Sequence, residues 1–187
     1  MPNIRLSEVN VLIKNKTGTF KILEDVSLSI PDKKITAVIG KSGCGKTTLA
    51  KSILGLVDYT GDIYFDDANL RFFSVQDRTI SYVGQNFALF PNLTIFNNIA
   101  MPLKSLRISG DEIRYRVKEM AEMLHISECL TRKPKDLSIG QCQRAALARA
   151  LIKKPNAYIF DEPFSALDNE TSTGIFEEMK RIFDLNE

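Results

Sequence analysis

At 187 residues and 44% hydrophobic content, the chain can form one large domain with a real core and room for a subdomain. The formal net charge of +2 supplies no basic field, which argues against a nucleic-acid partner. Three cysteines at unrelated spacings, with no N-terminal apolar segment, predict reduced thiols in the cytosol. No apolar run approaches the ~18 to 20 residues of a membrane span, so we expect any membrane role to act through a partner.

The N-terminal region alternates apolar and polar residues over 4–11 and again over 22–30, with a polar turn at 14–19 between them. This pattern predicts an antiparallel hairpin or meander. Residues 61–65 and 80–83 are expected to form two further short strands, the second of which is stopped by Gly84 and Gln85.

An apolar run at residues 35–39 predicts a buried parallel strand, and it leads into the pattern glycine, any four residues, glycine, lysine, threonine. Glycines let several backbone N–H groups approach phosphate oxygens, and a helix that begins near Lys46 directs its positive end at the same anion. Lys46 can reach terminal phosphates, and Thr47 offers a hydroxyl to Mg²⁺. The predicted phosphate-binding residues are Gly40, Lys41, Ser42, Gly43, Cys44, Gly45, Lys46, Thr47 and Thr48.

Residues 86–150 have a helical pattern. Ser109 with Glu112, and Ser138 with Gln141, are spaced as capping boxes ahead of helices. The single histidine, His125, follows an apolar helical face, and we interpret it as structural or solvent-facing in preference to a metal ligand.

Residues 157–160 predict a short apolar strand that ends at Asp161 and Glu162, followed by a helix over 171–183. An aspartate at this end of a strand, near a phosphate loop, can hold Mg²⁺ directly or through water. The adjacent glutamate is placed to orient and deprotonate an attacking water.

The segment Leu-Ser-Ile-Gly-Gln at 137–141 resembles the Leu-Ser-Gly-Gly-Gln signature of the ATP-binding cassette family. The order of motifs is also that of the family: phosphate loop, glutamine loop at Gln85, signature, acidic strand end, and then the segment 165–168. The stretches 89–94, 98–100 and 132–134 look like the ATPase subunits of solute importers, especially those for sugars.

The resemblance implies an α/β fold in which a P-loop NTPase parallel-sheet core is joined by N-terminal antiparallel strands and an inserted helical subdomain. Residues 1–187 would be one nucleotide-binding domain, with the core at 1–85 and 151–187 and the helical subdomain at about 86–150.

Such domains sandwich two ATP molecules in a head-to-tail dimer and act with permease subunits at the inner face of the membrane. Ser138, Gly140 and Gln141 would meet the partner's γ-phosphate, Gln85 would contact the metal or the attacking water, and Asp168 would reach across the dimer.

The chain departs from the family pattern in several places. Ile139 stands at the first signature glycine, where a stiff branched side chain should weaken capping of the partner's ATP. Cys142 replaces a longer polar residue, and the final strand with its histidine loop is expected to be missing after Glu187. Phe20 is a candidate for stacking on adenine, although Leu12 and Ile13 occupy the usual place.

Three functions remain open at this point. The first is the cytoplasmic ATPase subunit of a solute importer. The second is a hydrolysis-impaired nucleotide-binding fragment or regulatory module, which Ile139 and the missing histidine favour. The third is a soluble ABC ATPase outside transport, against which the near-neutral charge and the importer-like stretch argue.

Overall fold

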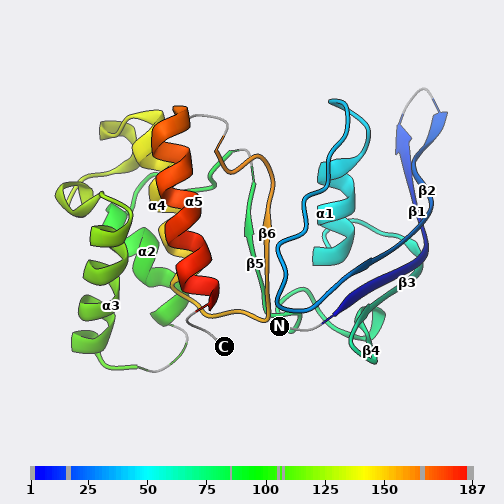
Figure 1. Cartoon of the computed structure of the whole chain (residues 1–187), viewed down its shortest axis with the longest axis horizontal. Helices are drawn as coiled ribbons and strands as arrows, with labels where there is room; N and C mark the ends of the chain where they lie inside the picture. The colour runs from blue at the N-terminus through cyan, green and yellow to red at the C-terminus, as the bar shows by residue number, and fades with distance from the viewer. Residues whose placement is uncertain are drawn as a thin grey trace. The chain divides into compact units, whose positions relative to one another are not determined.

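The computed structural model describes residues 3–15, 18–84, 86–104, 106, 108–164 and 167–184 (Figure 1). The chain divides into two compact units, which we describe separately. The first contains residues 1–80 and 155–159, and the second contains residues 81–154 and 160–187.

The first unit contains a four-stranded antiparallel sheet in the order β2-β1-β3-β4. Its members are β1 (Ile4–Asn15), β2 (Gly18–Ile30), β3 (Thr60–Phe65) and β4 (Ala68–Asn69). β1 pairs with both β2 and β3, and irregularities in its register lie between Leu6 and Leu12. The predicted N-terminal hairpin is therefore confirmed.

One side of this sheet packs against helix α1 (Lys46–Leu54). Leu49 and Ile53 of α1 join Val9, Val11 and Ile63 of the sheet in a buried apolar core. This core anchors the helix that follows the phosphate loop.

The C-terminal end of α1 is closed by a glycine and a buried arginine. Gly55 has φ 76°, and a Cβ added there would lie 2.6 Å from Cζ of Arg78. Arg78 donates hydrogen bonds to the carbonyls of Ser52 and Ile53 in the last turn and to that of Leu70 in a 3-10 helix, η1 (Leu70–Phe72). A cation at this end complements the helix dipole, so α1 is held at the end opposite the phosphate loop.

The buried strand predicted at residues 35–39 is wrong for this structure. The segment has no strand assignment and is exposed, with Ile39 92% exposed. In the part of the chain that the structure describes, no strand pairs with it. The apolar pattern is typical of a buried parallel strand, but such a strand forms only where neighbouring strands and helices cover it, and the pattern does not specify these neighbours.

Two short strands, β5 (Ile80–Val83) and β6 (Ala157–Phe160), form a second sheet. Both have the bounds that the sequence predicted. The chain passes between the two units at three points: within β5, just before Pro155, and within β6.

The second unit is mostly helical, and its helices are α2 (Ile95–Lys104), α3 (Gly110–Met123), α4 (Ile139–Leu151) and α5 (Asn169–Asp184). Two short 3-10 helices, η2 (Ser127–Cys129) and η3 (Pro134–Asp136), lie between α3 and α4. Both predicted caps are present. Ser109 caps α3, and Ser138 with Gln141 forms a complete capping box on α4. In α5, Ile175 and Met179 are buried.

The loop that leads into α2 is organised by one buried amide. The Asn98 side chain accepts from the Phe90 N–H and donates to the carbonyls of Phe90, Leu93 and Thr94. These bonds tie residues 90, 93 and 94 of the loop to the buried side chain of Asn98, which gives the importer-like stretch a defined shape.

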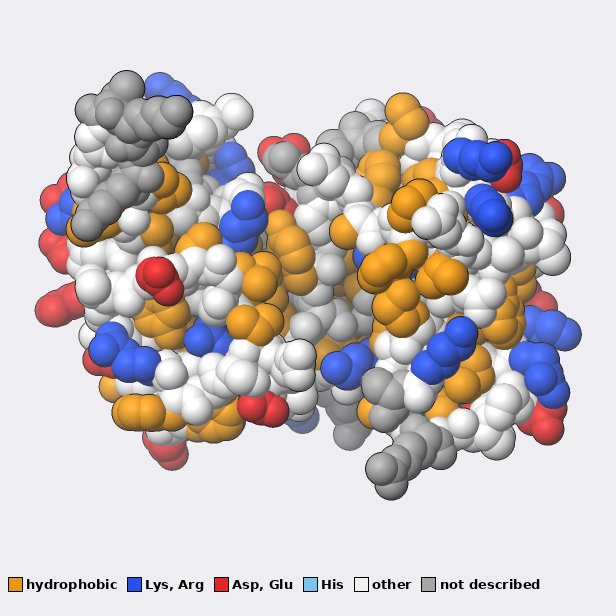
Figure 2. All heavy atoms as spheres, turned by 180° about the vertical axis from the view of Figure 1, so that it is seen from behind, with side chains coloured by type: hydrophobic (Ala, Val, Ile, Leu, Met, Phe, Trp, Pro, Cys, Tyr) orange, Lys and Arg blue, Asp and Glu red, His pale blue; other side chains and the backbone are white. Residues whose placement is uncertain are grey.

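Figure 2 shows one face of the molecule, on which side chains of both charges are mixed with exposed hydrophobic groups. Among the residues described, no helix is both long enough and apolar enough to cross a bilayer.

Candidate functional site

The phosphate loop lies in the first unit, between the exposed segment 35–39 and α1. The Cys44 N–H donates to the Lys41 carbonyl, and Gly43 and Gly45 have φ values of 79° and 100°. Gly45, the N-cap of α1, is favoured by its positive φ, and a Cβ there would also lie 2.9 Å from a methyl of Leu23 and 3.2 Å from the Ile22 carbonyl oxygen. The chain thus turns sharply into the helix.

Lys46 folds back over this loop. Its Nζ donates to the carbonyl oxygens of Gly40 at 2.9 Å and Lys41 at 3.0 Å. The first turn of α1 holds no acidic residue, so no carboxylate there competes for the positive end of the helix. A lysine, glycines and a helix N-terminus gathered in one loop can bind a phosphate chain.

The acidic strand end lies in the second unit. Asp161 is only 8% exposed, and its N–H donates to the Val83 carbonyl at 2.8 Å. The Tyr82 hydroxyl donates to Asp161 Oδ2 at 3.4 Å. Burial, followed by the charge and hydrogen bond of Asp161, raises the pKa of Tyr82, which therefore remains a hydrogen-bond donor at neutral pH.

Glu162, the predicted base, is exposed and has φ 55°. A non-glycine residue in this left-handed region is disfavoured. The following residue is fixed by α4, because the buried Gln143 side chain donates from Nε2 to the Pro163 carbonyl.

The signature residues form the N-terminus of α4. Ser138 Oγ accepts from the Gln141 N–H at 3.2 Å, and Gln141 Oε1 accepts from the Ser138 N–H at 3.0 Å. Gly140 is half-buried in the first turn, whereas Ile139 is 66% exposed. The predicted cap is thus confirmed, and the branched side chain of Ile139 stands on the surface of the turn.

Asp168 caps α5. Its carboxylate accepts from the Thr171 N–H at 2.8 Å and from the Thr171 hydroxyl at 2.7 Å. These hydrogen bonds, the main-chain one first, lower the pKa of the Asp168 carboxyl. Gln85 and residues 165–166 lie outside the described residues.

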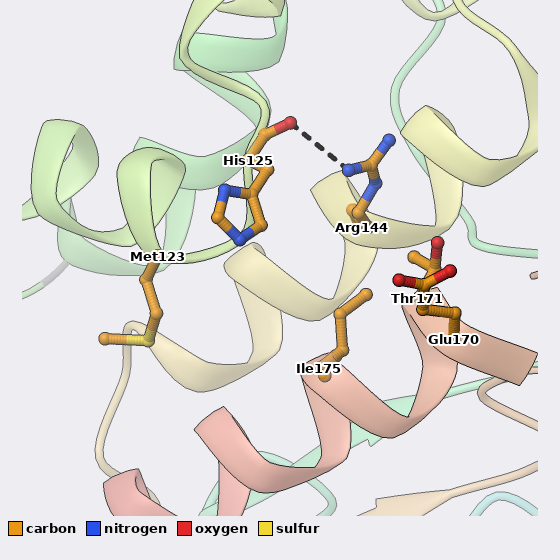
Figure 3. A pocket seen from close by; sticks show the side chains of 7 residues that line it. Met123, His125, Arg144, Glu170, Thr171 and Ile175 are labelled. Carbon is orange, nitrogen blue, oxygen red and sulfur yellow. Dashed lines mark hydrogen bonds between the residues drawn. The ribbon is translucent and has the colours of Figure 1, made fainter.

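His125 follows the end of α3 with φ 52° and is exposed. It lines an open pocket of about 360 Å³ with Arg144 of α4 and Glu170 and Thr171 of α5, and Arg144 donates to its carbonyl oxygen (Figure 3). No group of three potential metal ligands occurs among the residues described. The placement agrees with a solvent-facing histidine.

The sequence model of one family, described as ABC transporter, matches residues 23–165. The chain belongs to the ABC transporter family. The glucose import ATP-binding protein GlcV of Saccharolobus solfataricus is 44% identical over 171 residues, which are 86% of this chain and 48% of that protein. The trehalose/maltose import ATP-binding protein MalK of Thermococcus litoralis is 40% identical over 172 residues, or 88% of this chain and 46% of that protein. The chain spans about half the length of these ABC relatives.

Solved ABC cassettes share the fold. The dimeric structure of MJ0796, titled a bacterial ABC transporter cassette, has a TM-score of 0.91 at 31% identity and covers 98% of this chain and 84% of that one. Its post-hydrolysis state with ADP and Pi has a TM-score of 0.90. The predicted α/β ABC ATPase fold is therefore confirmed.

The structure groups the predicted site residues by unit. Residues 40–48 lie in one loop and helix start of the first unit, whereas Asp161, Glu162, Asp168 and the α4 N-terminus belong to the second. In the hairpin, Phe20 is exposed and opposite Ile13, and its adenine contact stays a prediction.

Sequence reasoning missed Tyr82, which contacts Asp161. Tyr82 lies in β5, and nothing near it in the sequence indicates that Asp161, which follows β6, would lie next to it. The predicted domain bounds at 1–85, 86–150 and 151–187 also stay a prediction.

Proposed function

We propose that the chain is the ATP-binding part of an ABC importer subunit, which binds and hydrolyses Mg-ATP to drive uptake of a sugar-type solute. The observation that carries this proposal is the phosphate loop, in which Lys46 crosses the glycine turn at the positive end of α1. The importer names of GlcV and MalK support the substrate class. The permease partners and the cytoplasmic location at the inner membrane face are part of the same proposal.

Mg²⁺ fits the oxygen donors that the chain offers. Thr47 supplies a hydroxyl, Asp161 a largely buried carboxylate beside Tyr82, and Gln85 an amide oxygen. Oxygen ligands of this kind suit Mg²⁺, which would neutralise charge on the phosphates when bound.

Separate residues of the chain bind the phosphates, act on the attacking water and contact the second subunit. Lys46 and the N–H groups of residues 40–48 hold and orient the phosphates. Glu162 takes the proton from the attacking water, and Gln85 orients that water. Ser138, Gly140 and Gln141, at the start of α4, close on the ATP of a second subunit in a head-to-tail dimer, and Asp168 reaches across it.

The cysteines provide a binding test. Cys44 is exposed in the phosphate loop, whereas Cys129 is buried and Cys142 is half-buried. Burial raises the pKa of both Cys129 and Cys142, which leaves less of the reactive thiolate. We expect alkylation to modify Cys44 first, and saturating Mg-ATP to slow that reaction at least ~10-fold.

Alkylation sites would be mapped by mass spectrometry over a time course. The Lys46→Ala variant serves as the control, because Mg-ATP should leave its Cys44 rate unchanged. Equal rates at Cys44 with and without Mg-ATP would contradict binding at this loop.

A second candidate function is a nucleotide-binding module with little turnover, which the exposed Ile139 favours. If Ile139 obstructs the partner's phosphate, Ile139→Gly should raise phosphate release about two- to five-fold, equivalent to ~1 kcal/mol or less of barrier. The gain is limited because glycine also weakens the first turn of α4.

The matched control is Ile139→Leu, which keeps the bulk and should leave turnover unchanged. Both variants would be assayed at one protein concentration high enough to favour dimers. No increase for Ile139→Gly would mean that the side chain does not limit turnover.

A further inference from the structure

The chain just after Gln85 is held in an unfavourable backbone conformation. Phe87 and Ala88 have φ values of 51° and 47°, so two consecutive non-glycine residues occupy the left-handed region. The Phe87 N–H donates to the Gly84 carbonyl, and the Ala88 N–H donates to the Asn86 carbonyl. Tight turns of this kind persist only where the surroundings hold them.

Arg149 of α4 stabilises this turn through two hydrogen bonds. Its guanidinium donates from Nη1 to the Ala88 carbonyl at 2.7 Å and from Nη2 to the Phe87 carbonyl at 2.8 Å. Both distances are those of charge-assisted bonds, and a planar fork fixes two acceptors more rigidly than a single donor would.

Arg149 is half-buried, so its charge depends on these two hydrogen bonds in place of water. Burial lowers the pKa of its guanidinium, which still remains charged at neutral pH. No ion pair among the described residues includes Arg149, so the two carbonyls are its counterparts in the structure. A half-buried charge of this kind is tolerated when such bonds replace its lost hydration.

The same helix also holds the chain after Glu162, through Gln143 and the Pro163 carbonyl. Gln143 is completely buried and lies six positions before Arg149 on α4. One helix, which Ser138 caps, therefore contacts the main chain downstream of both predicted catalytic residues.

We propose that Arg149 is a positioning residue that fixes residues 87–88 on α4, so that the chain after Gln85 and the helix carrying Ser138–Gln141 move as one body. This inference rests on the proposed function for its effect on hydrolysis. The fixed loop itself can be measured without nucleotide.

The first test is hydrogen exchange by mass spectrometry on Arg149→Met. We expect amides in residues 86–90 to exchange at least ~10-fold faster, while those of Lys46–Leu54 keep their protection. The control is Arg144→Met, which removes an arginine of the same helix that also donates to a main-chain carbonyl, that of His125. Arg149→Lys keeps the charge without the fork and should give an intermediate rate.

The second test uses the backbone strain. Glycine at position 88 relieves a left-handed residue, so Ala88→Gly should raise Tm by about 2–4 °C in the parent. In Arg149→Met the loop is released, so Ala88→Gly should give no increase. Equal gains in both backgrounds, or equal exchange in Arg149→Met and Arg144→Met, would overturn the proposal. If Arg149→Met does not fold, the same comparisons are made with Arg149→Lys.

The third test separates positioning from general damage. Arg149→Met should keep its ATP Kd within about twofold, because the phosphate loop is untouched, and lower kcat about tenfold with KM unchanged. An unchanged kcat would overturn the effect on hydrolysis. If the parent chain itself binds no ATP, the proposed function fails, while the exchange and Tm comparisons still decide the role of Arg149.

Discussion

Replacing Lys46 with alanine should abolish ATP binding at micromolar nucleotide. The Lys46 ammonium lies 2.9 and 3.0 Å from the carbonyls of Gly40 and Lys41, which places a positive charge over the turn where the terminal phosphates would bind. Hydrogen bonds to charged groups contribute about 1.5–3 kcal/mol each. Losing even two of them lowers affinity by roughly 10²- to 10⁴-fold.

Calorimetric titration with Mg-ATP would measure this loss. Lys51→Ala is the matched control, because it removes one lysine from the last turn of the same helix, at the opposite end from the phosphate loop. Thermal unfolding of both variants would show that they are folded. Equal nucleotide affinity for the parent and Lys46→Ala would refute binding through this loop.

Local signals predicted much of the fold. Ser138 with Gln141 formed a capping box because both hydrogen bonds lie within one turn, and their spacing alone determines them. Residues 157–160 form β6, as the short apolar run predicted, although its pairing with the distant β5 was not visible in the run itself. The cap depends on neighbours in the sequence, whereas the strand also needs a partner.

Features that depend on distant partners could not be predicted. Residues 35–39 have the composition of a buried strand, yet they are exposed here, because burial requires covering elements that no local pattern specifies. Likewise, no pattern around Arg149 in the sequence indicated its partners. Its role emerged only when the fold placed the carbonyls of Phe87 and Ala88, some 60 residues earlier, against its guanidinium.

Glu162→Gln should cut phosphate release by about 10²-fold or more, while ATP binding is kept. The amide has nearly the same shape as the carboxylate, but it cannot accept the proton of the attacking water. The left-handed backbone of Glu162 follows a main-chain bond from Asp161 to β5 and precedes the carbonyl of Pro163, which Gln143 holds. Because the main chain is held on both sides of residue 162, the substitution should remove the proton acceptor without rearranging the loop.

Phosphate release would be measured under saturating Mg-ATP, with the affinity of each protein determined separately. Glu170→Gln, which neutralises an exposed glutamate at the start of α5, is the matched control and should release phosphate at the parental rate. If Glu162→Gln released phosphate within about threefold of the parental rate, Glu162 would be excluded as the general base, because a general base accelerates the reaction about 10²- to 10⁴-fold. A large loss of ATP affinity would instead assign Glu162 to binding. Only the combination of retained affinity and lost turnover supports proton transfer by Glu162.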